Sequence, residues 1–327
     1  MPVNHYDPKL DHDAASHMQS APAETIHSRQ RLLGLVLVVI GLVWLVNSTL
    51  PMAFERFFGE QRSASFDQRY STQHIILDAA SSHVILQYSN EPQLRVRFEQ
   101  NGSEKGTVQV VQDGDTLRIS HQMTPCFFCD DDTMYELEVP KNIQVEVHSI
   151  SGDIEAHDLV GMLSVASQSG EIKLNNLQGS LSATTSSGDI RVDESNMTEA
   201  TLETTSGEIV FSGSSDKILS KSVSGDIQIE NDRASQFMLS TASGDLSYIG
   251  QAASSSDVAT ISGDVKLKLS RESNTALTLS TVSGDLESDI NLSELIKNPQ
   301  MLSGKMGTGA IPLNVHTTSG DIHISLR

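Results

Sequence analysis

The sequence predicts an all-β fold, a β-solenoid built from two-strand rungs of 18–19 residues, and three observations support this prediction. A Ser-Gly-acidic-apolar motif, seen in "TTSSGDIRV" at residues 184–192, occurs nine times. Its glycines recur at a nearly constant short spacing, which indicates stacked repeats. Apolar and polar residues alternate on both sides of each glycine, as in strands that bury one face.

The glycines of the motif set the period. The first seven spacings are 18, 18, 19, 18, 19, 19 and 21 residues, and the last is 36, about two repeats. We expect glycine to supply a turn with positive φ or a close approach between rungs, and the preceding serine to cap the turn. The motif glycines are Gly152, Gly170, Gly188, Gly207, Gly225, Gly244, Gly263, Gly284 and Gly320.

Each period has room for two strands of about five residues and two turns. The position two residues after the glycine is aliphatic in all nine copies, from Ile154 to Ile322. The positions five and seven residues before it are also mostly apolar. We therefore expect parallel strands between successive rungs, wound right-handed according to the crossover rule. A meander of antiparallel hairpins that turn at Ser-Gly remains the alternative.

An acidic residue follows every motif glycine. Stacked rungs would place these carboxylates roughly 5 Å apart, where they repel one another. Solvent-exposed turn capping, backbone N–H donors or a ladder of bound Ca²⁺ or Mg²⁺ could offset this repulsion, and no other cofactor is expected. The acidic residues are Asp153, Glu171, Asp189, Glu208, Asp226, Asp245, Asp264, Asp285 and Asp321.

The N-terminal region predicts a membrane anchor. Residues 32–54 carry no charge, and 23 residues are enough to span a bilayer of roughly 30 Å. We expect a disordered cytoplasmic tail at 1–28, a transmembrane helix at 29–54 and a linker at 55–69. Arg29 and Arg31 favour a cytoplasmic N-terminus in a single-pass inner-membrane protein whose C-terminal domain is periplasmic or otherwise extracytoplasmic. A cleaved signal peptide and a buried soluble helix remain alternatives.

The repeat domain is expected at 70–327, with irregular rungs at 70–140 and an insertion at 287–312. "HIILDAASSHVILQYS" (74–89) has the alternation of a rung but places Ser82 and His83 where Gly-Asp would stand. It predicts a degenerate first rung, since terminal repeats are atypical. The insertion predicts a short helix or loop, followed by a glycine-rich hairpin.

Cys126 and Cys129 form an isolated C-x-x-C before three aspartates. In an oxidising compartment we expect them to form a disulfide that fixes a loop. A zinc site would need further ligands, and a redox dithiol would normally lie at a helix N-terminus, but both alternatives stay open.

Charge and spacing narrow the function classes. The chain has 42 acidic and 22 basic residues, a net charge of −20, which argues against phosphate-based binding of nucleic acid. No Ser/His/Asp spacing, phosphate-binding loop or paired-carboxylate cleft stands out, so we expect no enzyme and assign no catalytic residue.

The "VPKNIQVEVHSISGDIEA" and "TTSSGDIRV" copies and the late "SGKMGTGAIPLNVHTTSGDI" resemble the bacterial putative-adhesin β-strand repeat family, a domain of unknown function. The resemblance covers roughly residues 70–327. It implies a solenoid-like fold, a membrane anchor, and roles in adhesion or envelope-stress signalling.

These observations favour a membrane-anchored, non-enzymatic binding or scaffold module of the cell envelope. Its expected partners are an envelope protein or a glycan. The alternatives are a self-assembling solenoid filament and, less favoured, a polysaccharide-active enzyme on a β-helix.

Overall fold

Strands make up the regular secondary structure of the residues that the computed structural model describes, which are 60–62, 65–102, 107–122 and 131–327. No helix in these ranges is long and apolar enough to cross a membrane. The tail predicted at 1–28, the transmembrane helix at 29–54 and the cysteine pair Cys126 and Cys129 lie outside the described residues. These predictions therefore stay predictions.

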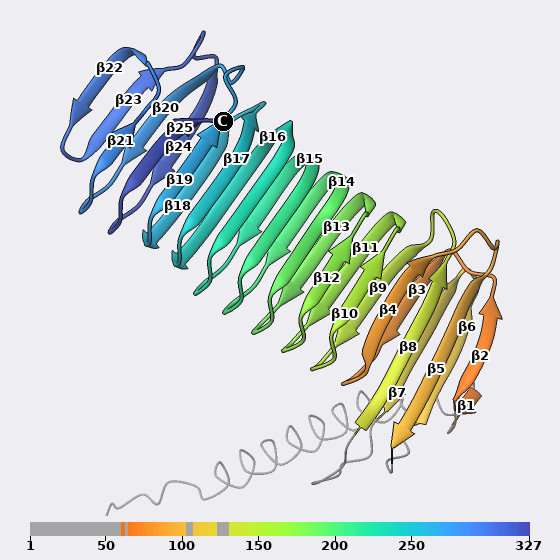
Figure 1. Cartoon of the computed structure of the whole chain (residues 1–327). Coiled ribbons are helices and arrows are strands. Elements are labelled where there is room, and N and C mark those ends of the chain that lie inside the picture. Colours follow the sequence, from red (N-terminus) through yellow and green to blue (C-terminus); the bar gives the residue numbers. More distant parts are fainter. Residues whose placement is uncertain (1–59, 63–64, 103–106, 123–130) are drawn as a thin grey trace, which may run out of the picture. The chain divides into compact units, whose positions relative to one another are not determined.

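The regular rungs stack in parallel, as the repeat predicts. Ile154 pairs with Ile172, which pairs with Ile190, which in turn pairs with Ile209. The antiparallel meander is therefore wrong for these rungs. Figure 1 shows the successive strands side by side along the stack. The strands are β9 (Gln144–Ser149), β10 (Ile154–His157), β11 (Val160–Ser167), β12 (Ile172–Asn175), β13 (Gln178–Thr185), β14 (Ile190–Glu203), β15 (Ile209–Lys221), β16 (Ile227–Ser243), β17 (Leu246–Ala252), β18 (Ser256–Ser262) and β19 (Val265–Leu269).

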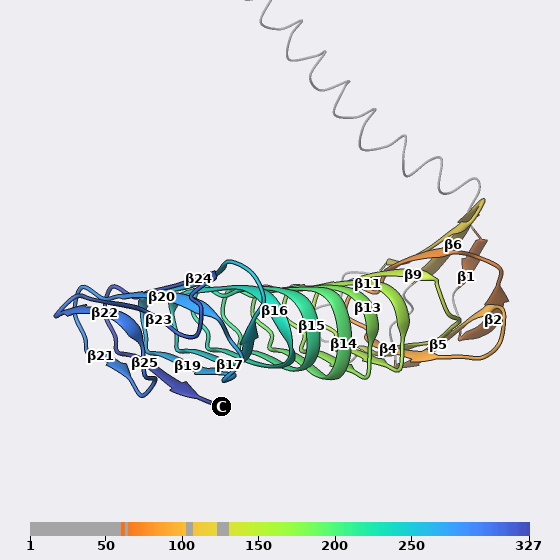
Figure 2. The ribbon, with the colours of Figure 1, turned by 90° about the horizontal axis from the view of Figure 1, so that it is seen from above.

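Each rung contributes to two facing layers, seen from above in Figure 2. One layer holds the residues after the motif glycine, and the other holds those before the next one. Strands β14, β15 and β16 are long because each bends from one layer into the other. The start of β14 pairs with β12 and its end pairs with β13. In these three rungs the turn opposite the glycine corner is thus part of a continuous strand.

The core is the narrow space between the layers. The aliphatic residues two positions after the glycines are at most 4% exposed. The residues five and seven positions before each motif glycine are buried as well. Because like residues stack along the axis, the core is one continuous apolar cluster, with aromatic pairs such as Phe237 and Tyr248 stacked at 3.8 Å.

The N-terminal end departs from the repeat. Strands β3 (His74–Asp78) and β4 (His83–Tyr88) stack on β9 and β10, which confirms the degenerate rung. Beyond it the strands pair antiparallel, β5 (Leu94–Gly102) with β8 (Asp131–Val139) and β6 (Thr107–Asp113) with β7 (Thr116–Gln122).

The linker predicted at 55–69 is corrected in part. β1 (Glu60–Arg62) pairs with β6, and β2 (Phe66–Tyr70) pairs with β5. These residues are strands because β6 and β5 at the end of the stack offer them free edges to pair with.

The C-terminal rungs do not stack in sequence order. β24 (Ile311–His316) lies between β18 and β20 (Thr275–Ser280), and β25 (Ile322–Leu326) lies between β19 and β21 (Leu286–Ser288). The rung of Gly320 is therefore inserted between those of Gly263 and Gly284. Sequence spacing alone carries no information about this order.

For the insertion at 287–312 the sequence predicted a short helix or a loop, but the structure has strands there. β22 (Ser293–Asn298) and β23 (Met301–Lys305) form an antiparallel hairpin, and β23 also pairs with β20. The helix expectation is wrong because β20 leaves an open edge, and pairing with it satisfies the backbone groups of β23. Gly307 and Gly309, both with φ near +64°, then return the chain to β24.

Candidate functional site

The glycine corner is the repeated feature that the sequence singles out. A Cβ added at any of the nine glycines would lie 1.8–2.3 Å from a backbone oxygen of the neighbouring rung. At Gly225 this oxygen belongs to Gly207, at 1.8 Å. The close approach between rungs that we predicted is confirmed at every corner, whereas positive φ occurs at only Gly263, Gly284 and Gly320.

The hydroxyl that caps the corner comes from a different position than expected. The residue three before the glycine is a buried Ser or Thr in every motif copy. Thr204 Oγ1 accepts a hydrogen bond from Gly207 N at 3.1 Å and donates one to Gly188 O at 3.2 Å. The serine directly before the glycine is exposed, as Ser206 illustrates. Our assignment of the cap to that serine is therefore wrong. The recurrence of Ser or Thr three residues before each glycine was the sequence signal for the true cap.

The aspartates of the motif bond from rung to rung. Six of them accept a hydrogen bond through Oδ1 from the backbone N–H of the acidic residue in the adjoining rung, at 2.7–2.9 Å. A charge-assisted bond of this kind offsets the repulsion between neighbouring carboxylates. The six aspartates are Asp153, Asp189, Asp226, Asp245, Asp264 and Asp321, and Asp285 ends the series as donor only.

The two glutamates in this row behave differently. Glu171 forms an ion pair with Lys173 at 2.8 Å, and Glu208 accepts a hydrogen bond from Gln228 at 2.7 Å. The additional methylene lets each carboxylate reach a side chain instead, Lys173 in the same rung or Gln228 in the next rung. Within the described ranges, no group of three or more His, Cys, Asp or Glu side chains is placed to hold a metal ion. Of the alternatives that could offset the repulsion between these carboxylates, the geometry shows the backbone N–H donors.

A shallow trough lies on the outer face of the layer before the corners. Its volume is about 370 Å³. The central strands β11 and β13 contribute the small side chains of Ser164, Ser180 and Ser182. Glu146 on β9 and Glu199 on β14 lie at its two sides. The trough is open to solvent, and its lining combines serine hydroxyls with the apolar side chain of Met162, so it could contact both polar and apolar groups of a ligand.

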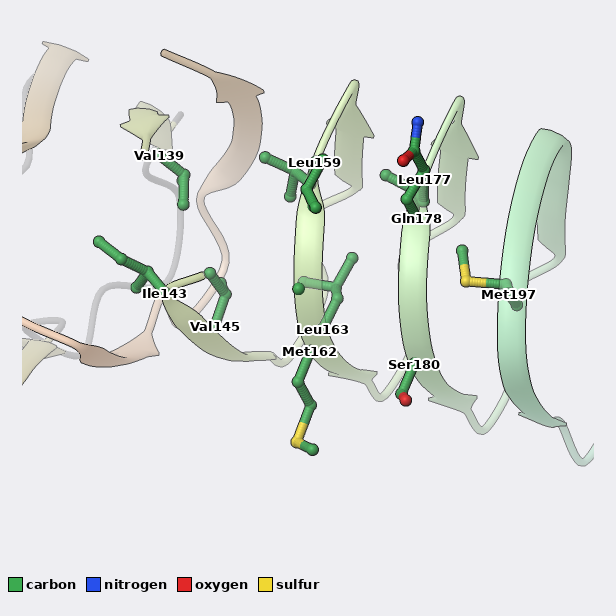
Figure 3. Close-up of a pocket in the computed structure, with 12 residues that line it drawn as sticks. Val139, Ile143, Val145, Leu159, Met162, Leu163, Leu177, Gln178, Ser180 and Met197 are labelled. Carbon is green, nitrogen blue, oxygen red and sulfur yellow. The ribbon is translucent and has the colours of Figure 1, made fainter. Parts of the chain in front are cut away.

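The interior beside this trough is closed. Figure 3 shows Leu159, Leu163 and Leu177 in an apolar crevice, while Met162 and Ser180 extend away from it. The crevice has a volume of about 10 Å³, which is no more than one water molecule needs. A ligand would therefore bind on this part of the stack from outside.

One polar cluster that the sequence did not reveal lies in the N-terminal core. Ser82 Oγ lies 3.1 Å from His121 Nδ1 and 2.7 Å from Thr133 Oγ1. All three side chains are buried, with His121 8% exposed. Because Ser82 replaces the glycine of the degenerate rung, its hydroxyl lies inside the stack. The burial of all three side chains closes the cluster to a substrate.

Comparisons with solved structures give similar chains of low sequence identity. A "putative adhesin" from Bacteroides fragilis NCTC 9343 is 12% identical, covers 80% of this chain and 98% of its own, and has a TM-score of 0.42. A "putative lipid binding protein" from Parabacteroides distasonis ATCC 8503 is 14% identical, with 81% and 96% covered and a TM-score of 0.43. A "putative adhesin" from the same organism is 12% identical, with 81% and 97% covered and a TM-score of 0.36. No curated protein matches the chain.

A family model matches nearly all of the described stack. The match extends over residues 72–325, from the degenerate rung to the last strand. It confirms the resemblance read from the Ser-Gly-acidic repeat. The chain belongs to the Toastrack DUF4097 family.

Proposed function

We propose that this chain is a membrane-anchored, extracytoplasmic protein that binds or scaffolds an envelope component without catalysing a reaction. The observation that carries the proposal is the open trough of about 370 Å³ on the outer face of the stack. A glycan fits this lining, because sugars carry both hydroxyl groups and apolar C–H faces and the lining offers hydroxyls, carboxylates and the Met162 side chain. The uncharged run at residues 32–54 supports an anchor in the inner membrane.

The binding proposal is tested with the full chain in lipid nanodiscs and isolated envelope glycans, including peptidoglycan. We expect the chain to sediment with one of these glycan fractions. Ser182→Tyr fills the trough and should abolish sedimentation, whereas Ser240→Tyr, on the same outer face away from the trough, should leave it unchanged. Binding that Ser182→Tyr leaves intact would refute the trough as the site, and sedimentation with no fraction would refute glycan binding.

The location is tested in cells that express the full chain. We expect it to remain in the membrane fraction after alkaline carbonate extraction. Externally added protease should cleave the repeat domain once the outer barrier is removed, but not in intact inverted membranes. Recovery in the soluble fraction would contradict the anchor, and cleavage in inverted vesicles alone would contradict the orientation.

Self-assembly is a second candidate, favoured by strand β22. All six residues of β22 are exposed, including Leu295 and Ile296, and its partner among the described strands is β23. An open edge of this kind can pair with another chain. Analytical ultracentrifugation of the full chain in nanodiscs that each hold one copy should then show concentration-dependent association, and a single species at all concentrations would remove this candidate.

A further inference from the structure

Exposed apolar side chains recur at one position of the repeat, two residues before the motif glycine. Eight large apolar side chains of the described residues are strongly exposed, and four of these stand two residues before a motif glycine: Ile150, Val223, Ile261 and Val282. Each of the four is 51–61% exposed. Isolated exposed apolar residues need no explanation, but a row at one register position does.

The row is densest in the five C-terminal rungs. In stacking order it runs through Val223, Ala242, Ile261, Thr318 and Val282, and we call it the apolar row. Backbone bonds confirm the order: Ser243 N donates to Val223 O, Ser319 N donates to Ile261 O, and Ser283 N donates to Thr318 O, at 2.9–3.0 Å. Consecutive members are therefore about 4.8 Å apart along the stack.

An acidic row follows the apolar row through the same five rungs, on the other side of the glycines. It consists of Asp226, Asp245, Asp264, Asp321 and Asp285. The hydrogen bonds between rungs fix four of these carboxylates through Oδ1. In the described part of the chain none of the five forms an ion pair, whereas Glu199, Asp216 and Asp193 elsewhere each pair with Lys or Arg.

We infer that this C-terminal edge docks a cationic amphipathic α-helix of a partner protein. The acidic row attracts a positive stripe, and the apolar row buries an apolar stripe beside it. An anionic lipid surface or a nucleic acid would be repelled. The inference rests on the proposed binding function and names a partner class for a second surface, separate from the trough.

The spacing favours a helix over an extended segment. One face of a helix presents a side chain about every 5.4 Å, close to the 4.8 Å between rungs. One face of a strand presents a side chain only about every 6.8 Å. Five rungs span about 19 Å, which matches a helix of about 13 residues. Since the aspartates are already fixed, docking loses little side-chain entropy on this side of the interface.

The test uses the full chain in zwitterionic nanodiscs and two synthetic 14-residue peptides of Leu, Lys and Ala with identical composition. In one peptide Leu and Lys form adjacent stripes on a helix, and in the other their order is scrambled. Fluorescence anisotropy, corrected with empty nanodiscs, gives the affinities. We expect the striped peptide to bind at least tenfold more tightly than the scrambled one.

Two variants test the rows separately. Asp226→Asn/Asp245→Asn/Asp264→Asn removes three charges but keeps each Oδ1 acceptor, and Val223→Ser/Ile261→Ser/Val282→Ser removes the apolar side chains. Each should weaken binding of the striped peptide at least tenfold. The controls Asp113→Asn/Asp115→Asn/Glu272→Gln and Met238→Ser, at exposed positions off this edge and outside the trough, should change it less than twofold.

Equal affinity for the two peptides would overturn the inference. So would a charge control that weakens binding as much as the aspartate variant, because the attraction would then depend on net charge alone. Unchanged binding by either edge variant would have the same consequence. The glycan test of the trough is independent of these results, so the two proposals can fail separately.

Discussion

The carboxylate of Asp245 accepts a hydrogen bond from the backbone N–H of Asp264 in the next rung, at 2.8 Å. The same bond links six pairs of neighbouring rungs, with aspartate as the acceptor each time. The repeated acidic residue is therefore part of the ladder that joins the rungs, and its charge remains available at the surface.

Replacing Asp245 separates the bond from the charge. Asp245→Asn keeps the Oδ1 acceptor and should leave the stability nearly unchanged. Asp245→Ala and Asp245→Glu should each lower the free energy of unfolding by about 1 kcal/mol, the net contribution of such a bond. Glutamate is expected to fail because Glu171 and Glu208 bond the side chains of Lys173 and Gln228 instead of a backbone N–H of the next rung. Urea unfolding of the full chain in nanodiscs measures this, and a fully stable Asp245→Glu would contradict it.

Gly225→Ala should destabilise the stack severely. The new Cβ would lie 1.8 Å from Gly207 O, so two rungs would have to separate. We expect a loss of about 3 kcal/mol or more. Gly114→Ala is the control: its Cβ meets nothing within 4 Å, and only its φ of +55° costs about 1–2 kcal/mol. Similar thermal midpoints for the two variants would refute the close approach.

Thr204→Val tests the corrected cap. The buried hydroxyl of Thr204 bonds both Gly207 N and Gly188 O, and its loss leaves these backbone groups unsatisfied. We expect a cost of about 1–3 kcal/mol. Thr205→Val, at the exposed neighbouring position, should be nearly neutral. Equal urea midpoints for the two variants would show that the hydroxyl of Thr204 does not cap the corner.

Tyr248 makes the stability depend on alkaline pH. Burial raises the pKa of its phenol to about 12, although the hydrogen bond with Ser235 opposes this shift. Because the folded pKa lies above the unfolded value of about 10, this contribution is complete below pH 10 and is lost as the pH rises towards 12. Tyr248→Phe should remove this part of the pH dependence. Absorbance of tyrosinate at 295 nm, followed with unfolding, checks it, and an identical alkaline profile for the variant would contradict the assignment.

Residues at equal positions relative to the motif glycine predict most of the rungs. Each aliphatic residue two positions after a glycine has to face its counterpart in the next rung, so periodicity and burial agree from Ile154 to Val265. The rung formed by 74–89 was recognisable by the same alternation, even with Ser82 at its corner.

Other features depend on contacts that a period does not encode. The insertion of the Gly320 rung between those of Gly263 and Gly284 is decided by which strand edge is open when the chain returns. β1 and β22 form because of such edges as well. The trough and the apolar row required knowledge of which side chains share a face and how exposed they are, and only the register supplied this.

Corresponding residues stack in one line, and the rung of Gly320 is inserted between those of Gly263 and Gly284. Pulsed electron resonance tests this arrangement with spin labels on a Cys126→Ser/Cys129→Ser background, one label at residue 173 and the other at 266, 323 or 287. Pairing places these positions five, six and seven rungs from Lys173. We expect backbone separations of about 24, 29 and 34 Å. A shorter distance to 287 than to 323, or distances that do not grow with rung number, would contradict this arrangement.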